Sequence, residues 1–352
     1  MTIFRTLLIL ALVVPLALGA RQQVATPPVA RFAAAAKMVG AANAFLATLT
    51  ETQRASAVFE FGGSQTTGWS NLPTGIFQRK GLRLGDLSAQ QRDAAMALVA
   101  AAASRSGYGK IVNIMNADET LKNAGGGRTG GRQGGGGRGG SIRFGADEYY
   151  LALLGKPSSS EPWLIQFGGH HLAINVTVVG QSSVLTPSLP ATQPARYVLN
   201  GQTIRPLGNE NDKGFALINA LDAAQQKQAI LGYQVSDLVL GPGADGKVIQ
   251  PEGILASALS PPQQELLLDV IREWVGILND EAATAKMAEI KANLPRTYFA
   301  WSGSTVNGGL AYYRVQGPTV IIEYAPQQGD LQHIHTIYRD PTNDYGAKMV
   351  KR

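Results

Sequence analysis

All four histidines of the 352-residue chain lie in two short stretches. The first stretch holds His170 and His171 after a pair of glycines, and the second holds His333 and His335. Histidines that served only as surface residues would be scattered along the chain. Imidazole nitrogens are the commonest protein ligands for transition metals. The clustering therefore predicts one metal site built from two segments that are far apart in the sequence.

Strand geometry decides which of these rings can act together. The β-branched residues around His333 and His335 predict a strand, and side chains two positions apart in a strand share a face. His170 and His171 are adjacent and would point to opposite faces, unless the preceding glycines form a bulge or a turn. Either one can supply the third ligand. Three imidazoles with a fourth position for water or substrate form an open site of the catalytic type.

Glu323 is a carboxylate in an unusual setting. It interrupts the apolar segment 320–324, where a charge without a partner is costly. It can ligate the metal or act as the general base that takes a proton from water. Arg339 lies on the same predicted strand face as the second histidine pair, where it can neutralise Glu323 or bind an anionic substrate group. Tyr345 is the alternative group for orienting the substrate.

Asp340 and Asp344 flank Pro341 in a short polar segment. Aspartates beside a proline are typical of turns, in which carboxylates accept hydrogen bonds from nearby backbone N–H groups. We therefore interpret both as turn residues in preference to metal ligands.

The chain contains no cysteine. This excludes disulfides and a thiolate nucleophile or ligand, and leaves imidazole, carboxylate and water as donors to a metal. That donor set favours zinc, copper, iron or manganese, with zinc and copper the leading expectations. No Gly-x-Ser-x-Gly motif lies near the histidines, so a serine hydrolase has no comparable support.

A pattern of leucine, a capping residue, two further residues and glutamine recurs along the chain. A capping residue followed three positions later by glutamine is the capping box that begins helices. Its copies begin 38 residues apart within each of two pairs, and the pairs are separated by 172 residues. This spacing predicts an internal duplication, and chance recurrence of a common motif is the alternative. The copies begin at Leu49, Leu87, Leu221 and Leu259.

The predicted fold class is α+β, with two similar fused halves in one compact unit. Residues 31–200 and 201–352 form the halves, and each has helices followed by an antiparallel β-hairpin or sheet. Each half ends near a histidine stretch, so the two hairpins are expected to meet at one site. Further matches between the halves join 80–82 to 252–254, Tyr149-Tyr150 to Tyr312-Tyr313, and 163–167 to 320–324.

Residues 1–20 have the form of a secretory signal, with Arg5, an apolar run and small residues at its end. Residues 21–30 form a proline-containing linker. We expect an exported protein, periplasmic or extracellular, with no membrane span after cleavage of the signal.

Residues 125–140 are mostly glycine, with Arg128, Arg132 and Arg138 among them. This composition is typical of RNA-binding arms, but in an exported chain a flexible insertion between a helix and a strand is the preferred interpretation. The net charge of +6 is diluted along the chain, so no nucleic-acid partner is expected.

Several motifs together resemble an exported family known only as a domain of unknown function, number thirty-five hundred of that series. They are Gly-His-His-Leu at 169–172, Phe-Ala-Trp-x-Gly at 299–303, Tyr-Tyr-Arg at 312–314, Gly-Pro at 317–318, Ile-Glu at 322–323 and His-x-His-Thr-x-x-Arg-Asp-Pro-x-Asn-Asp-Tyr-Gly at 333–346. The resemblance covers most of the chain from about residue 31, apart from the Gly/Arg-rich insertion. It implies no activity. It does imply that His170, His171, Glu323, His333, His335, Arg339, Asp340, Asp344 and Tyr345 occupy motif positions.

These observations predict an exported metal-binding protein that performs metal-assisted hydrolysis of a small or polymeric substrate. The candidate metal ligands are His170, His171, His333 and His335, and the candidate catalytic residues are Glu323, Arg339 and Tyr345. The alternatives are a copper or iron redox enzyme and a non-catalytic periplasmic protein that binds a metal or another ligand. An open coordination position favours an enzyme, whereas four protein ligands favour a binding protein.

Overall fold

The computed structural model describes residues 33–125 and 141–350. The predicted signal at 1–20, the linker at 21–30 and all but the first residue of the Gly/Arg-rich insertion lie outside the described residues. None of the helices in these two ranges combines the length and the apolar character that a membrane crossing requires.

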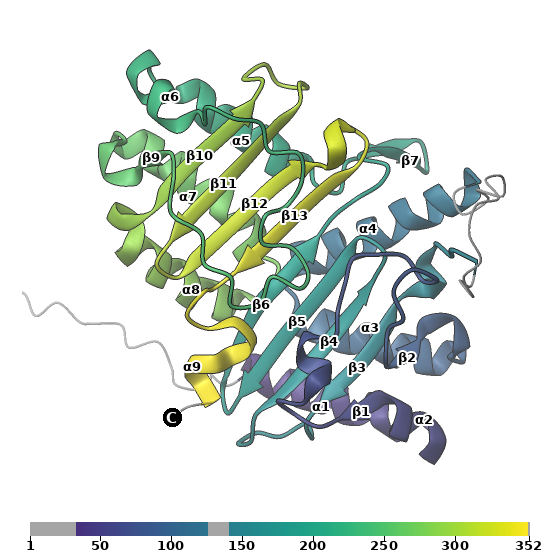
Figure 1. Ribbon diagram of the computed structural model, residues 1–352. Helices are drawn as coiled ribbons and strands as arrows, with labels where there is room; N and C mark the ends of the chain where they lie inside the picture. Colours follow the sequence, from purple (N-terminus) through teal and green to yellow (C-terminus); the bar gives the residue numbers. More distant parts are fainter. Residues whose placement is uncertain (1–32, 126–140, 351–352) are drawn as a thin grey trace, which may run out of the picture.

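The described chain has a mixed α+β fold in which a large, mostly antiparallel sheet is covered by helices (Figure 1). In both halves of the sequence, the helices precede the long strands. The first half contains α1 (Ala33–Ala47), α2 (Glu51–Ala57), β1 (Val58–Phe59), β2 (Leu82–Arg83), α3 (Ala89–Ala102), α4 (Arg105–Asn123), β3 (Tyr150–Leu154), β4 (Trp163–Gly169), β5 (Leu172–Val179) and β6 (Ser182–Pro190). After the β7 (Tyr197–Leu199) and β8 (Gln202–Ile204) hairpin come α5 (Gly208–Ala220), α6 (Ala223–Ala229), β9 (Ile254–Leu255), α7 (Pro261–Val275), α8 (Asp280–Asn293), β10 (Tyr298–Gly303), β11 (Ala311–Gly317), β12 (Val320–Pro326), β13 (Ile334–Arg339) and α9 (Ala347–Val350).

One continuous sheet joins the two halves. Its eleven strands run in the order β1-β3-β4-β5-β6-β13-β12-β11-β10-β9, with β2 beside β3. At the centre of the sheet β6 and β13 are antiparallel, and Tyr338 pairs with Ser188. The last long strand of each half therefore meets its counterpart in the middle of the sheet.

Both faces of this sheet are buried. Helices α1, α3 and α4 cover β3 to β6, and α5, α7 and α8 cover β10 to β13 (Figure 1). On the opposite face Trp69, Leu238 and Tyr345, which belong to loops and the C-terminal segment, pack against Ala173 and Ile337. Burial on both faces explains why strands such as β3, β4 and β12 are apolar at most positions.

The predicted helix starts are confirmed at α2, α3, α6 and α7. In each one the glutamine side-chain oxygen accepts the backbone N–H of the capping residue, at 2.8–3.0 Å. The glutamines also bond to each other in pairs, Gln53 to Gln91 at 3.3 Å and Gln225 to Gln263 at 3.0 Å. Glutamate also suits a capping box, but two facing carboxylates would repel, which explains glutamine at all four positions.

The short strands β2 and β9 begin in the same way. Each follows a glycine with positive φ, 104° at Gly81 and 93° at Gly253. A Cβ at Gly81 would lie 2.6 Å from the carbonyl oxygen of Leu151, and one at Gly253 would lie 2.1 Å from that of Phe299. Only glycine permits this approach at either position, so the predicted match of 80–82 with 252–254 agrees with the local structure.

The other two sequence matches do not follow the order of elements. Each one joins a strand of the first half to the strand that comes after its counterpart in the second half. That order pairs β3 with β10, β4 with β11, β5 with β12 and β6 with β13. Tyr150 is the first residue of β3 and Tyr149 precedes it, whereas Tyr312-Tyr313 lies in β11. Buried strands use interchangeable apolar residues, so local similarity does not fix the register between them. The two histidine stretches therefore do not occupy corresponding positions, because one lies between β4 and β5 and the other at the start of β13.

Candidate metal centre

His170 and His171 form the tight turn between β4 and β5. The structure thus provides the turn that the sequence left as one alternative, although it falls on the histidines rather than on the glycines before them. His171 has a φ of 63°, a left-handed conformation that is uncommon for a residue with a Cβ. Strained residues of this kind cluster at functional sites.

The turn is fixed by hydrogen bonds with four residues that are distant in the sequence. They involve both carbonyl and N–H groups of the turn, so the backbone that carries the two rings has little freedom. Arg79 donates to the Gly169 carbonyl at 2.7 Å, Tyr149 to that of His170 at 2.8 Å and Ala191 to that of His171 at 2.8 Å, and His171 donates to Asn71 at 3.1 Å.

Three imidazole nitrogens converge at this turn. Nε2 of His333 lies 2.8 Å from Nε2 of His171 and 3.1 Å from Nε2 of His335. His333, which directly precedes β13, and His335 within it thus lie close together, and His171 is the member of the adjacent pair beside them. These three residues form a group whose donor atoms can hold a metal ion.

The tautomer of His335 follows from its two partners. Its Nδ1 lies 3.0 Å from an Asp237 oxygen, and its Nε2 lies 3.3 Å from the Asn71 amide nitrogen. Because a carboxylate accepts and an amide NH₂ donates, the proton belongs on Nδ1 and the lone pair on Nε2. A carboxylate behind a histidine, which orients the ring and raises its basicity, is the usual support of a metal ligand.

Burial keeps two of the ligands neutral. It lowers the pKa of His171 well below its usual value, and the neighbouring histidines lower it further. Burial and the charges of nearby histidines likewise lower the pKa of His333 to about 4. Neutral imidazoles at physiological pH are ready to bind a cation.

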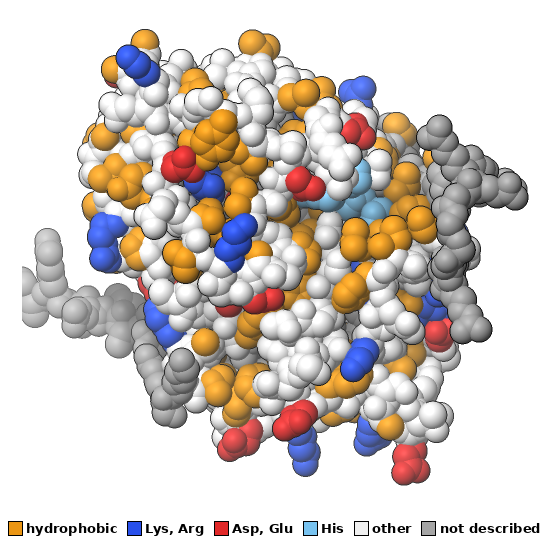
Figure 2. Space-filling model, viewed as in Figure 1, with side chains coloured by type: hydrophobic (Ala, Val, Ile, Leu, Met, Phe, Trp, Pro, Cys, Tyr) orange, Lys and Arg blue, Asp and Glu red, His pale blue; other side chains and the backbone are white. Residues whose placement is uncertain are grey.

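The spacing of the three nitrogens suits a small metal ion. A tetrahedral ion with Zn–N bonds of about 2.0–2.1 Å holds its ligands about 3.3 Å apart, so the separations of 2.8 and 3.1 Å from His333 need to widen by only a few tenths of an ångström. Histidine side chains are visible at the surface on the loop-covered side, bordered by hydrophobic side chains (Figure 2). The histidine cluster therefore reaches the surface, although His171 and His335 are themselves buried.

His170 belongs to a second group next to the first. Its Nδ1 lies 2.6 Å from an oxygen of Asp118, and its ring centroid lies 3.6 Å from that of His171. Burial lowers the pKa of His170 despite the contact with Asp118. Asp118, His170 and His171 are all buried, and their donor atoms lie within 4.8 Å of one another.

Glu323 is placed apart from the histidines. Its carboxylate accepts the Tyr312 hydroxyl at 2.6 Å and the backbone N–H groups of Val239 and Leu240 at 3.1 and 2.8 Å. Glu323 is fully buried, and these hydrogen bonds supply the partners that a buried carboxylate requires. The bonds of Glu323 attach the segment 237–245 to β12.

Arg339 and Tyr345 attach the same segment from β13 and the C-terminal turn. Arg339 donates to the carbonyls of Leu240 and Gly241, at 2.8 and 3.1 Å, and to Asp245 at 3.1 Å. The Tyr345 hydroxyl donates to the same Asp245 at 2.7 Å. The three residues predicted as catalytic thus share one structural task, which is to hold the segment that delivers Asp237 to His335.

Asp340 and Asp344 serve the turn, as the sequence indicates. Asp340 accepts the backbone N–H and the hydroxyl of Thr342 at 2.9 and 2.7 Å, and its own N–H donates to Asp344 at 3.1 Å. Asp344 also accepts a bond from Arg339 at 2.8 Å.

A family model described as a protein of unknown function (DUF3500) matches residues 32–347. The chain belongs to this family. The match spans both histidine stretches and the whole described sheet, so the resemblance seen in the motifs is confirmed. Searches of curated proteins and of solved structures each gave no match.

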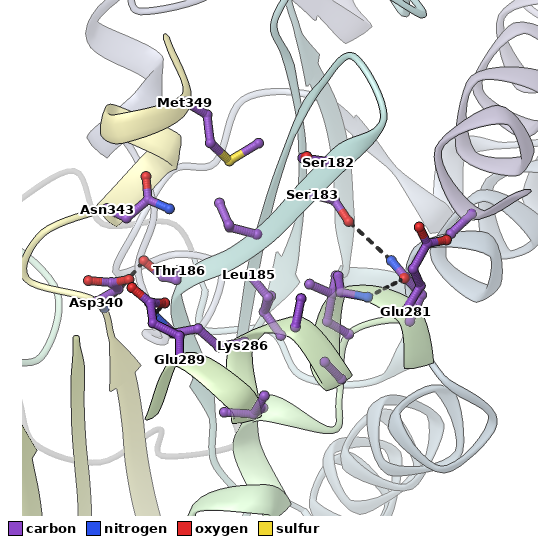
Figure 3. A pocket seen from close by; sticks show the side chains of 18 of the residues that line it. Ser182, Ser183, Leu185, Thr186, Glu281, Lys286, Glu289, Asp340, Asn343 and Met349 are labelled. Carbon is purple, nitrogen blue, oxygen red and sulfur yellow. Dashed lines mark hydrogen bonds and ion pairs between the residues drawn. The ribbon is translucent and has the colours of Figure 1, made fainter. Parts of the chain in front are cut away.

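A cleft of about 700 Å³ lies elsewhere in this DUF3500 chain, beside β6, α8 and the C-terminal segment (Figure 3). Three of its charged groups are paired with one another, because Lys286 bonds to both Asp340 and Glu289. Asn279 donates to the Ser183 hydroxyl at 3.2 Å on its far side. The histidines do not line this cleft.

Sequence reasoning missed Asp118, Asp237 and Asn71 as partners of the histidines. Asp118 had a detectable signal, since it lies on the buried stripe of α4 with Ile111 and Ile114. A carboxylate on such a buried stripe is costly without a partner, so its position predicts one. Asp237 and Asn71 lie in loops, and no periodicity distinguishes them from other polar loop residues.

Proposed function

We propose that the protein binds a divalent transition metal through His171, His333 and His335 and uses it to hydrolyse a small or polymeric substrate. The observation that carries the proposal is the convergence of three imidazoles, one of which has a carboxylate behind it. Three protein nitrogens leave one tetrahedral position for water or substrate, which is the arrangement of catalytic rather than structural sites.

The ion would supply Lewis-acid chemistry, which polarises a scissile bond and acidifies water near neutral pH. The chain supplies the geometry. Asp237 holds the His335 ring so that its Nε2 lies 3.1 Å from Nε2 of His333, and the bonded turn holds His171. Glu323, Arg339 and Tyr345 then act as positioning residues, because they fix the segment that carries Asp237.

Two other functions have an observation in their favour. Copper redox chemistry is favoured by the ligand group, which is composed of imidazoles alone. A binding protein without turnover is favoured by the contacts of Glu323, Arg339 and Tyr345, which are all engaged in holding a loop. The identity of the bound element separates the hydrolytic from the redox alternative.

The test is elemental analysis of the untagged protein beside a His333→Ala, His335→Ala double variant. We expect zinc, copper or iron in the parent and a loss of at least one equivalent in the double variant. Gln332→Ala is the control, because this exposed neighbour of His333 is not in the ligand group. A parent that carries no metal and binds none on titration with Zn²⁺ or Cu²⁺ contradicts the proposal.

We further propose that the two halves arose by internal duplication. Reciprocal bonds at their helix links support it: Ser104 N–H donates to Ile277 and Asn279 N–H donates to Ala102, each at 3.0 Å. The shared order of elements and the two glutamine pairs agree with this origin. Experimental coordinates in which β3 to β6 fail to superpose on β10 to β13 would count against it.

Export is the proposed route for this chain, on the strength of the charged, apolar and small-residue segments in 1–20. The lack of cysteine fits a site that must work without thiols in an oxidising compartment. Mass analysis of protein from the periplasm or medium should find a chain shortened by about twenty residues. A full-length chain retained in the cytoplasm would refute export.

A further inference from the structure

We propose that the centre has a second metal position, formed by Asp118, His170 and His171, so that His171 is shared by two ions. The inference rests on the proposed function, because it adds an ion to the same centre. All three residues are buried, and their donor atoms lie within 4.8 Å of one another. Asp118 supplies a carboxylate, which the three-histidine group lacks.

The two nitrogens of His171 have different surroundings. Its Nε2 lies 2.8 Å from Nε2 of His333 and belongs to the first position. Its Nδ1 is buried and has no hydrogen-bond partner among the described residues. A buried polar atom left unpaired costs about 1–3 kcal/mol, so native structures rarely keep one without a use. A second cation would use this atom.

Asp118 and His170 are held as a ligand pair would be. One Asp118 oxygen lies 2.6 Å from Nδ1 of His170, and the other accepts the backbone N–H of Gly145 at 2.8 Å. Phe144 packs against the His170 ring, with centroids 4.7 Å apart. These contacts fix both donors before any ion arrives, which lowers the cost of binding it.

The second position offers one carboxylate oxygen and two imidazole nitrogens. This mixed set suits zinc, copper, iron or manganese. Binding there displaces the proton that Asp118 and His170 share and the remaining ring proton of His171, and both protons pass to solvent. The His171 ring would then bridge the two ions as an imidazolate.

The test is titration of the metal-free protein with Zn²⁺, followed by elemental analysis after removal of free ion. We expect two equivalents in the parent and one in Asp118→Asn. Loading with Cu²⁺ gives an independent readout, because two copper ions bridged by imidazolate couple magnetically. The parent should then show a reduced electron paramagnetic resonance signal per copper, and the variant should show the signal of an isolated ion.

Glu119→Gln is the matched control. Glu119 follows Asp118 on α4 and accepts the N–H of Ala146 at 3.0 Å, much as Asp118 accepts that of Gly145, but it is in neither ligand group. This variant should keep two equivalents. Circular dichroism of each variant establishes that it is folded before its metal content is compared.

The outcomes separate this inference from the proposed function. One equivalent in the parent, unchanged in Asp118→Asn, overturns the second position and leaves the three-histidine site standing. Two equivalents in both proteins also overturn it, because Asp118 would then not be a ligand. No metal in the parent removes the proposed function together with the second position.

Discussion

Nε2 of His171 lies 2.8 Å from Nε2 of His333, although 162 residues separate the two histidines in the chain. The contact exists because β6 and β13 are neighbours at the centre of the sheet, which places the β4–β5 turn beside the start of β13. Each half of the chain therefore contributes part of one ligand group. Neither half alone contains it, so the centre depends on the assembly of the whole sheet.

Asp237→Asn should weaken metal binding without abolishing it. The Asp237 carboxylate accepts the Nδ1 proton of His335, and loss of such a partner typically costs a factor of about 10–100 in metal affinity. Competition with a chromophoric chelator measures the change. Asp330→Asn is the control, because Asp330 influences His333 through charge but is not bonded to a histidine ring. Equal weakening in both variants would show that charge, rather than the hydrogen bond, is responsible.

Glu323→Gln should destabilise the fold. The Glu323 carboxylate accepts three hydrogen bonds in a fully buried site, and an amide keeps one acceptor oxygen while turning a donor toward a backbone N–H. The free energy of unfolding should fall by about 1–3 kcal/mol in denaturant titration. Tyr312→Phe removes one of the bonds and should cost less. A variant that keeps its stability and loses only turnover would restore Glu323 as the general base.

The histidines could be found from sequence because they are rare and clustered, and strand alternation was enough to pair His333 with His335. The helix starts could be found because a capping box is a local pattern with a local cause. The choice between His170 and His171 could not be made, since it depends on a single turn whose left-handed residue is held by distant segments.

Other features depend on long-range packing and leave little trace in the sequence. A charge in an apolar strand indicated that Glu323 has a partner, but the partner proved to be loop backbone, which any sequence can supply. Asp237 lies in a segment without periodicity, and its place is set by Arg339 and Tyr345. The strand register between the halves was missed because apolar strands resemble one another.

Arg339→Lys should loosen the segment 237–245 and weaken metal binding with it. Lysine is a point donor and cannot reproduce the several directed bonds of the guanidinium group to this segment. Amide hydrogen exchange should become faster in 237–245, and metal affinity should fall by about tenfold. Arg314→Lys is the matched control, because this buried strand arginine bonds to Glu252, farther along the same loop. Unchanged exchange in Arg339→Lys would contradict the positioning role.

Acidification should destabilise the metal-free protein. Burial holds the pKa of folded His333 at about 4, below the ordinary value of 6.5, so the folded state binds fewer protons than the unfolded state between these values. Stability is therefore complete above about pH 6.5 and declines as the pH falls toward 4. Melting temperatures in chelator at pH 7 and pH 5 measure the decline. His333→Asn should show a smaller decline than the parent, and an equal one would contradict the assignment.

The left-handed backbone at His171 predicts that glycine and alanine variants rank in opposite orders of stability at His171 and at His333. At a φ of 63° a Cβ is strained, so in chelator His171→Gly should be more stable than His171→Ala by about 1 kcal/mol. His333 is not among the residues with positive φ, so there the order should reverse, because glycine loses more backbone freedom on folding. All four variants lack one imidazole, and the comparison within each pair cancels the loss of metal. Urea unfolding of the four proteins measures both differences. If alanine is the more stable at both positions, the turn at His171 is not left-handed in solution.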